Sequence, residues 1–538
     1  MTNFIVMEQN DRLPSMFMGV ALERDRWNDF NFQTQYSLWV AMPEFTGRIG
    51  TVKILQRGQT TADPIKLVPG SLPPLDGSWV SLGQDLDYYE RLAELSDALR
   101  AEILEHLRDA LAFPEHASTF FGEPGWNTSV LRYITWNDFQ RDASVLLDRN
   151  YSKVARLDMS LTFGVAGWLN PLEINFQAPS DHLFWSVQDN KLPDRLAVII
   201  GRNGSGKSTL LSRLARILHA SQKDRDHEAL TSLGWVTPKG IGFTRIVNVA
   251  YSAFDAFQLP GINGQERRQI VDDLERGVGR YHYCGLRDLV REVRQADGIG
   301  EIDGNPIPQD GPDRQATIIL KSSEALTAEF EKAISRIISS ERTALFAEVC
   351  RNLASDSSFV ELGQNPGEAV MATPTHWFRT WSTGHKIVMH AAASIVAFTE
   401  PKSIVLIDEP ESHLHPPLLA ALMHAIRIIL GKNDAFGIVV THSPVVVQET
   451  LRRHISIVRR VGTSVTISKP NIETYGESIG EITNEVFGLN ADATDFHQVL
   501  SRLVQSGMPL ESIEKLFEPG LSLQARAYVM SEMARRPG

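Results

Sequence analysis

The residues Gly201 to Ser208, GRNGSGKS, have the types and the spacing of a loop that binds phosphate. Glycines let consecutive backbone N–H groups turn toward one anion, and the start of a following helix adds partial positive charge. We expect Lys207 to contact the β- and γ-phosphates of ATP and Ser208 to bind Mg²⁺. An apolar strand, RLAVII, precedes the loop and a helical pattern follows it, as this motif requires. The expected nucleotide-binding residues are Gly201, Asn203, Gly204, Ser205, Gly206, Lys207, Ser208 and Thr209.

Two further apolar strands end in polar residues. The strand SIVLIDE ends in Asp408 and Glu409, and the strand GIVVTH ends in His442. An aspartate at a strand tip can hold the same Mg²⁺ as Ser208, and the adjacent Glu409 can act as base for the attacking water. His442 can sense the γ-phosphate, although a lone histidine is more often structural. We therefore predict Lys207, Glu409 and His442 as catalytic residues and Ser208 and Asp408 as metal ligands.

The elements that must position these residues alternate between strands and helices from about residue 155 onward. This alternation predicts an α/β fold with a mostly parallel sheet, helices on both faces, and chemistry at the carboxyl ends of the strands. Residues 1–150 differ, because short strands are followed by leucines at helical spacing over 85–112, which predicts one long amphipathic helix. The expected units are an N-terminal α+β accessory domain (1–150), a first ATPase lobe (155–260), a helical insertion or lid (261–375), a second ATPase lobe (376–470) and a C-terminal helical segment (471–538).

Composition limits the setting of the protein. The chain has 538 residues, a formal charge of −12 and two cysteines, Cys284 and Cys350, so neither a disulfide framework nor a CxxC zinc site is expected. No apolar stretch reaches membrane-spanning length, and the N-terminus lacks the pattern of a signal peptide. We expect a cytoplasmic protein without membrane contact, in which any nucleic acid binds a local basic patch. One candidate patch is Arg287, Arg291 and Arg294, which a helix would place on one face, although such a run of charges more often forms a merely solvated face.

The order of these motifs resembles that of the ATP-binding-cassette (ABC) ATPases. In that family a signature sequence precedes the Walker B strand, and here WSTGHK, Trp381 to Lys386, occupies its place. The resemblance implies an ABC-type head in which Ser382 and Gly384 contact the γ-phosphate held by a second subunit. It thus implies a homodimer, or a higher oligomer, with ATP sandwiched between copies. Trp381 and His385 depart from the usual letters, so a plain helix N-cap at Ser382 stays open as an alternative.

Other elements of the family are less clear in this chain. The D-loop position reads ESHLHP, a form similar to that of soluble ATPases of the SMC, RecF and overcoming-lysogenization groups. His413 and His415 pack in this loop or, alternatively, bind a metal. The Q-loop residue is one of Ser252, Asp255 and Gln258, and the sequence leaves these three open.

Three stretches of the sequence resemble the PtuA-like ATPase subunit of Septu-type anti-phage systems, which some retrons also carry. They read VAYSAFDAF, YHYCGLR and ETYGESIGEITNEVFGL. The resemblance covers about residues 155–500 and implies a separate HNH nuclease (PtuB-like) as partner, with retron RNA or DNA, or phage DNA, as further contacts. No HNH pattern occurs in this chain, so we expect no nuclease activity of its own. The alternatives are a RecF-like DNA-repair ATPase and an ATP-binding scaffold without turnover, and a catalytic Glu409 argues against the scaffold.

Overall fold

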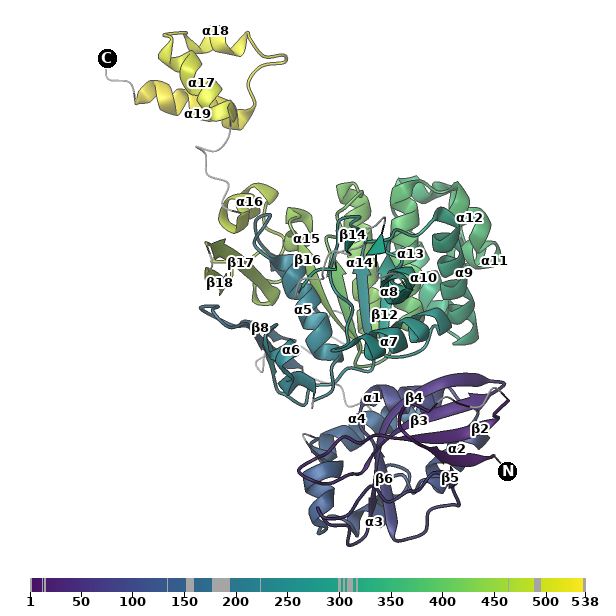
Figure 1. Cartoon of the computed structure of the whole chain (residues 1–538). Coiled ribbons are helices and arrows are strands. Elements are labelled where there is room, and N and C mark those ends of the chain that lie inside the picture. Colours follow the sequence, from purple (N-terminus) through teal and green to yellow (C-terminus); the bar gives the residue numbers. More distant parts are fainter. Residues whose placement is uncertain are drawn as a thin grey trace, which may run out of the picture.

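A computed structural model describes residues 2–11, 13, 16–132, 134–150, 159–176, 194–222, 224–298, 301–302, 305–306, 313–315, 318–462, 464–487 and 495–535. Its centre is a seven-stranded sheet of order β12-β11-β15-β16-β9-β17-β18 (Figure 1). The pairs from β12 to β17 are parallel, and β18 pairs with β17 antiparallel, so the sheet is mixed but mostly parallel. The strands are β9 (Leu196–Ile200), β11 (Ile246–Ala250), β12 (Tyr281–Gly285), β15 (Ile404–Asp408), β16 (Phe436–Thr441), β17 (Ile455–Val461) and β18 (Ser464–Ser468).

Alternate residues of the central strands feed two separate cores, one on each face of the sheet. In β15, for example, Val405 and Ile407 pack into one core, whereas Ile404 and Leu406 pack into the other. Successive side chains of a strand point to opposite faces, so a strand buried on both faces must be apolar throughout. This requirement accounts for the unbroken apolar runs in the sequence.

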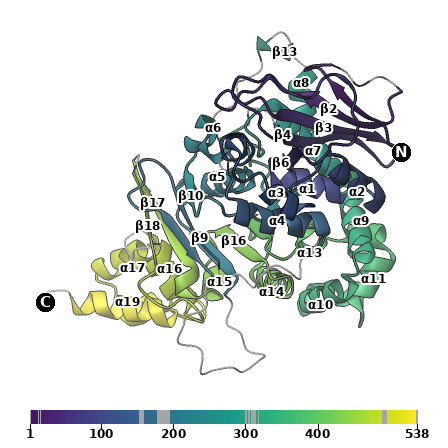
Figure 2. The same ribbon diagram turned by 90° about the horizontal axis from the view of Figure 1, so that it is seen from below.

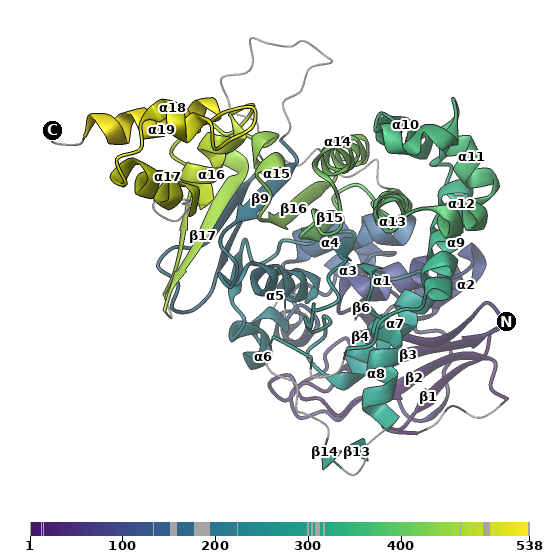
Figure 3. The ribbon, with the colours of Figure 1, turned by 90° about the horizontal axis from the view of Figure 1, so that it is seen from above.

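Helices cover both faces of this sheet (Figure 3). The helix α5 (Lys207–His219) follows β9 and packs on the face that it shares with α7. The opposite face carries α13 (Thr383–Phe398), with the helices between residues 323 and 380 beyond it. The remaining helices of this region are α6 (Glu228–Thr231), α7 (Gly264–Arg276), α8 (Leu289–Gly298), α9 (Ser323–Ser339), α10 (Thr343–Leu353), α11 (Pro366–Ala372), α12 (Pro374–Thr380), α14 (Pro416–Lys432), α15 (Pro444–Gln448) and α16 (Ile479–Phe487).

Smaller elements complete the chain. The strands β7 (Ser160–Gly164), β8 (Leu172–Asn175) and β10 (Trp235–Thr237) form a three-stranded sheet, and β13 (Glu301–Ile302) pairs with β14 (Asn305–Pro306). The C-terminal helices α17 (Asp495–Gln505), α18 (Leu510–Glu514) and α19 (Leu523–Ala534) pack on a small core of their own. In Figure 1 they lie at the end of the molecule opposite the N-terminal domain.

The segment 261–375, which we expected to be a helical insertion, also contains a strand of the central sheet. Strand β12 pairs in parallel with β11 from Tyr281 to Gly285 and forms one edge of the sheet. Its sequence, YHYCG, carries tyrosines and a buried cysteine instead of the Val and Ile that mark a buried strand. The helical lid therefore begins only after this strand.

The N-terminal domain is α+β, as predicted, with a six-stranded sheet of order β5-β1-β2-β3-β4-β6. Its strands are β1 (Phe4–Met7), β2 (Gly19–Arg24), β3 (Gln35–Met42), β4 (Phe45–Gln56), β5 (Gly70–Ser71) and β6 (Trp79–Gly83). The helices that follow are α1 (Leu86–Ala93), α2 (Asp97–His106), α3 (Pro114–Ser118), the π-helical turn η1 (Trp126–Val130) and α4 (Trp136–Asp148).

The single long helix predicted over 85–112 is wrong. The chain leaves the helix after α1, and the Ser96 hydroxyl then accepts a hydrogen bond from the Leu99 N–H and begins α2. A serine that competes for backbone donors ends one helix and caps the next. The leucines of the predicted stripe are nevertheless buried, including Leu92 and Leu107, so the pattern was correct about burial and wrong about continuity.

The N-terminal domain packs against the amino ends of the central strands (Figures 1 and 2). A basic residue stands just before each of β11, β12 and β15, and each meets an acid of the N-terminal domain. The pairs are Arg245 with Glu90, Arg280 with Asp87, and Lys402 with Asp142. Parallel strands begin at the same edge of a sheet, so these three cations form one row that holds the domain.

Candidate functional site

The phosphate loop joins β9 to α5, and its glycines are required by its geometry. Gly204 and Gly206 have φ of 79° and 93°, in the left-handed region that a side chain disfavours. A Cβ on Gly201 would lie 2.4 Å from the Val458 carbonyl oxygen, so a larger residue has no room there. Asn203 lies exposed at the tip of the loop, whereas Ser205 is buried and its Oγ has no hydrogen-bond partner among the described residues.

Lys207 lies across this loop. Its Nζ donates to the carbonyl oxygens of Gly201 at 3.0 Å and Arg202 at 3.3 Å. Burial lowers the pKa of Lys207, while the carboxylates of Glu409 and Asp408 act in the opposite direction. The ammonium group is therefore held within the loop by carbonyl groups that a phosphate can replace as partners. Thr209 follows on α5 and is half-buried.

Ser208 meets the tip of β15. Its Oγ donates to Asp408 Oδ1 at 3.1 Å, which joins the phosphate loop to the acid pair over 200 positions of sequence. Only β16 separates β9 from β15, and in the registers Asp408 is paired with Val440 and Thr441 with Ile200. The carboxyl ends of three neighbouring strands therefore gather the residues that the sequence predicted.

Asp408 is under electrostatic strain. Burial, together with the carboxylates of Asp255 and Glu409, raises the pKa of Asp408 to about 8, although the hydrogen bond from Ser208 acts in the opposite direction. Burial and Glu409 likewise raise the pKa of Asp255 to about 6, although the Arg287 guanidinium opposes this rise. Three carboxylates thus lie close enough to affect one another's pKa, and Lys207 and Arg287 are nearby cations that partly offset them. Crowded, desolvated carboxylates of this kind are typical of functional sites and fit a divalent cation.

This coupling separates Asp255 from the other Q-loop candidates. Ser252 accepts a hydrogen bond from the Phe254 N–H, and the Gln258 amide oxygen accepts one from Arg267, whereas the Asp255 carboxylate raises the pKa of Asp408. Asp255 is 9% exposed, and its Oδ2 has no partner in the part of the chain that the structure describes.

Arg287 also belongs to this environment. The prediction that it forms an exposed basic face with Arg291 and Arg294 is therefore wrong for Arg287. Arg287 precedes α8, is fully buried, and pairs with Glu292 at 2.7 Å. Its guanidinium donates to the Phe257 carbonyl oxygen at 2.7 Å, which fixes the segment that carries Asp255. Helical spacing alone misses this role because the helix begins after Arg287.

Glu409, the second member of the acid pair, lies next to His442. Glu409 adopts a left-handed φ of 45°, and its N–H donates to the Val440 carbonyl oxygen at 2.9 Å. A non-glycine residue in this region stores backbone strain, which functional sites tolerate. His442 Nδ1 lies 3.7 Å from Glu409 Oε1, and both side chains are partly exposed.

Glu411 is a residue whose role the sequence reasoning missed. Its Oε1 accepts hydrogen bonds from the Thr441 hydroxyl and from the His442 N–H, both at 2.7 Å, and lies 3.1 Å from His442 Nδ1. The carboxylate therefore fixes both the backbone and the ring of His442. The sequence does show an acid two positions after Glu409. We assigned this stretch only to D-loop packing and therefore did not predict a role for Glu411.

The signature segment begins α13. The Ser382 side chain accepts from the His385 N–H at 3.4 Å and is exposed, which fits both a plain N-cap and a surface that meets a second subunit. The two residues that depart from the usual signature sequence both pack on aromatic rings. Trp381 packs against Phe330, and His385 packs on Phe359. A Cβ on Gly384 would lie 3.3 Å from the His413 carbonyl oxygen, so this glycine lies against the D-loop.

The D-loop histidines have structural positions. His415 is the N-cap of α14 and accepts from the Leu418 N–H, and His413 adopts a left-handed φ of 67°. Within the described residues, no group of three or more His, Cys, Asp or Glu side chains could hold a metal ion, so these histidines have no metal site of that kind. The pair Ser208 and Asp408 differs from such a cage, because Mg²⁺ commonly combines one or two protein oxygens with substrate phosphates and water.

Residues 312–448 match the family described as "AAA domain, putative AbiEii toxin, Type IV TA system". That segment includes Ser382, Glu409 and His442 but begins after the phosphate loop. This segment is therefore similar to an AAA-type ATPase domain, and it lies within an α/β fold.

One relative spans the whole molecule. Protein ea59 of Escherichia phage lambda is 28% identical over 552 residues, covering 100% of this chain and 99% of the relative. Among solved structures, an ATP-binding cassette of an ABC transporter in its ADP conformation has a TM-score of 0.27 at 16% identity, covering 61% of this chain and 96% of that chain. A Smc head bound to the C-winged helix domain of ScpA has a TM-score of 0.25 at 12% identity, covering 58% and 96%. Among the described residues, no helix is both long enough and apolar enough to cross a membrane.

Proposed function

We propose that the chain is a Mg²⁺-dependent ATPase of the ABC kind that hydrolyses ATP between two copies of itself. The observation that carries this proposal is the contact between Ser208 and Asp408 at 3.1 Å, with Glu409 directly after Asp408. It joins a phosphate-binding loop to an acid pair across the carboxyl ends of parallel strands, where α/β proteins bind their ligands.

The roles of the residues follow from this geometry. Lys207 exchanges its carbonyl partners for the β- and γ-phosphates, and the backbone N–H groups of the loop surround the same oxygens. Glu409 accepts a proton from the attacking water, and His442, oriented by Glu411, contacts the γ-phosphate. Ser208 and Asp408 would hold Mg²⁺, which neutralises charge on the phosphates when bound. The raised pKa of Asp408 and the crowding by Asp255 fit that cation.

The test of hydrolysis is Glu409→Gln in the full chain. A general base contributes about 10²- to 10⁴-fold to a rate, so we expect turnover to fall by that factor while ATP binding persists. Glu511→Gln, on the C-terminal helix α18, removes the same charge at an exposed position and should leave turnover unchanged. Unchanged hydrolysis in Glu409→Gln would show that this carboxylate is not the base.

The dimer is tested at the signature. Ser382→Arg places a bulky cation where a second subunit must approach, so hydrolysis should be lost while the monomer still binds ATP. Ser382→Asp is a second variant that keeps a good N-cap for α13 but repels a γ-phosphate, and the same loss is expected. Ser522→Arg changes another exposed N-cap serine, on α19, and controls for the cap itself. Loss of ATP binding by the Ser382 variants in monomeric form would reduce WSTGHK to a helix start.

The biological role that we propose is control of a separate HNH nuclease in anti-phage defence. The sequence stretches that resemble Septu ATPases support this role. The description of the family matched over 312–448 names a putative toxin of a toxin–antitoxin system. Co-expression with the neighbouring reading frame should yield a complex with a small HNH protein whose DNA cleavage responds to ATP. Strong stimulation of hydrolysis by DNA alone, without such a partner, would favour a RecF-like repair ATPase.

A further inference from the structure

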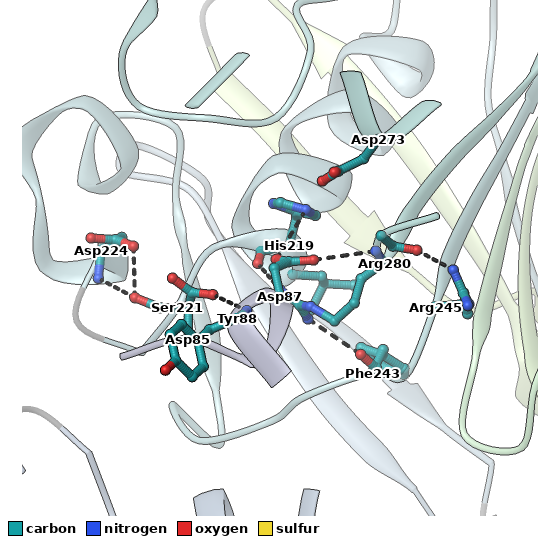
Figure 4. A network of polar contacts seen from close by, with 12 residues as sticks. Asp85, Asp87, Tyr88, His219, Ser221, Asp224, Phe243, Arg245, Asp273 and Arg280 are labelled. Atoms are coloured by element: carbon teal, nitrogen blue, oxygen red, sulfur yellow. Dashed lines mark hydrogen bonds and ion pairs between the residues drawn. The ribbon is translucent and has the colours of Figure 1, made fainter. Parts of the chain in front are cut away.

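A cavity of about 540 Å³ lies between the N-terminal domain and the ATPase core. The N-terminal domain contributes Asp85 and Asp87 to it, and the core contributes the segment after α5 and the start of α7. Figure 4 shows Asp85 and Asp87 near His219, Ser221 and Asp224 at this junction. The cavity lies at the end of α5 that is remote from Lys207, so it is separate from the phosphate loop.

Part of the charge around the cavity is neutralised by ion pairs. These pairs are Asp87 with Arg280 at 2.9 Å, Arg91 with Asp273 at 2.8 Å, Asp226 with Lys239 at 2.9 Å, and Arg132 with Asp29. Burial alone would raise the pKa of Asp87, but Arg280 and the other neighbouring groups together outweigh it and hold that pKa below its usual range. Burial lowers the pKa of His219 to about 4, so this ring adds no charge at neutral pH.

The remaining charges of the lining are strongly unbalanced. Four carboxylates, those of Asp25, Asp85, Asp224 and Glu266, and one guanidinium, that of Arg48, form no ion pair with another described residue. They leave a formal charge of −3 within a partly enclosed space. Burial, together with the nearby carboxylates of Asp224 and Asp85, raises the pKa of Glu266 to about 7. Buried charge without a partner is costly, so this arrangement favours a cation.

Two glutamines independently indicate that the occupant donates hydrogen bonds. Gln35 and Gln84 line the cavity with 8% and 6% exposure, and the amide oxygen of each has no partner among the described residues. Their orientation is fixed at the other end: Gln35 Nε2 donates to Asp25 Oδ2 at 2.7 Å, and Gln84 Nε2 donates to the carbonyl oxygens of Leu82 and Val130. Both amide oxygens are therefore buried acceptors that require a donor.

The chemistry of the occupant follows from these acceptors. A single metal ion does not fit, because no group of three acidic or metal-binding side chains converges on one point within the described ranges. Carboxylates spread around a cavity instead match ammonium groups that are spaced along one molecule. Apolar side chains also line the space, including Leu230, Ile262 and Ile270, and they can contact the methylene groups between such charges.

We propose that this inter-domain cavity binds a linear aliphatic polyamine with three positive charges. The ammonium groups donate to the four carboxylates and to the amide oxygens of Gln35 and Gln84. The ligand then adds to the ion pairs that hold the N-terminal domain on the core. This site does not depend on ATP hydrolysis, so it stands or falls separately from the proposed ATPase function.

The probe is spermidine, titrated calorimetrically into the full nucleotide-free chain at fixed ionic strength with EDTA present. We expect saturable binding and a rise of the melting temperature, with weaker binding of the shorter dication putrescine. The Mg²⁺ comparison uses Asp408→Asn, which lacks a proposed Mg²⁺ ligand of the phosphate site, and in that variant MgCl₂ at the same ionic strength should not reproduce the rise that spermidine gives. An absence of saturable spermidine binding, or equal protection of Asp408→Asn by Mg²⁺, would overturn the proposal.

The variants locate the site. Asp85→Asn and Glu266→Gln each remove one charge but keep the side-chain caps of α1 and α7, because Asn and Gln serve the same caps. Each should weaken spermidine binding by about tenfold, the usual value of a charged hydrogen bond. Asp97→Asn, at a residue whose side chain is 93% exposed, removes one charge from the surface and should change nothing.

Arg48 gives a test of opposite sign. Arg48→Gln removes the cation that opposes the ligand and can still donate to the Ser37 and Thr51 hydroxyls, which Arg48 contacts. We expect spermidine to bind this variant several-fold more tightly. Weaker binding, or unchanged affinity in Asp85→Asn and Glu266→Gln, would place the polyamine elsewhere on this acidic chain and refute the site.

Discussion

Replacing Asp408 with asparagine should stabilise the nucleotide-free protein at alkaline pH while abolishing Mg²⁺-dependent hydrolysis. Asp408 has a pKa of about 8 in the folded chain, whereas the ordinary pKa of an aspartate side chain is 3.8. The folded form thus binds the proton more tightly than the unfolded form does. The stability that this group contributes is greatest at low pH and is lost as the pH rises from about 4 to about 8. Asparagine carries no charge at any pH and does not show this loss.

The size of the effect follows from the width of that pH window. One pKa unit corresponds to about 1.4 kcal/mol, and about two units of the window lie between pH 6 and pH 8. The variant should therefore gain about 3 kcal/mol in free energy of unfolding, relative to the natural chain, when the pH is raised from about 6 to about 8.5. At roughly 2 °C per kcal/mol for a domain of this size, the melting temperatures should diverge by about 6 °C. Any fixed cost of burying the amide cancels in this difference.

The assay is a thermal melt of both proteins in EDTA across this pH range, repeated with Mg²⁺. Mg²⁺ should raise the melting temperature of the natural chain at alkaline pH and leave Asp408→Asn unaffected. Asp97→Asn removes an exposed carboxylate and should show the pH dependence of the natural chain. If Asp408→Asn followed the same pH dependence as the natural chain, Asp408 would not carry the raised pKa, and the crowding argument for the metal would fail.

Two further predictions concern Glu411 and the domain interface. Glu411→Gln keeps an acceptor for the His442 N–H but loses the charge beside its ring, so turnover should fall by about tenfold with ATP affinity unchanged; a fall in affinity alone would contradict the positioning role. Arg280→Met leaves Asp87 buried without its main partner, which should cost about 3–5 kcal/mol and make the N-terminal domain more susceptible to limited proteolysis. Asp87→Asn added to Arg280→Met should recover much of that loss, and no recovery would show that the ion pair is not what holds the domain.

The sequence was sufficient for the strands and loops that carry the expected chemistry. The strand that ends in Asp408 and the loop around Lys207 are local patterns, in which apolar runs and glycines are set by neighbours in the chain. The N-cap at Ser382 could be predicted for the same reason, because a serine before a helical pattern bonds to a backbone N–H only a few residues away.

Other features depend on residues that are distant in sequence, and local patterns do not contain them. Asp87 and Arg280 lie 193 positions apart, and each by itself reads as an ordinary surface charge. Asp255 could be separated from Ser252 and Gln258 only in the structure, where its carboxylate raises the pKa of Asp408. The burial of Arg287 contradicts its helical spacing because a tertiary partner, Glu292, outweighs the preference of a cation for solvent.

The row of cations at the amino ends of the central strands has an evolutionary consequence. A buried ion pair cannot lose one member without leaving the other charge uncompensated, so its two positions are inherited together. The chain can exchange its N-terminal domain only for one that presents acids opposite Arg245, Arg280 and Lys402. Along descent, substitutions at this junction should therefore occur as compensating pairs. The full-length relative from phage lambda, at 28% identity, offers a direct place to look for them.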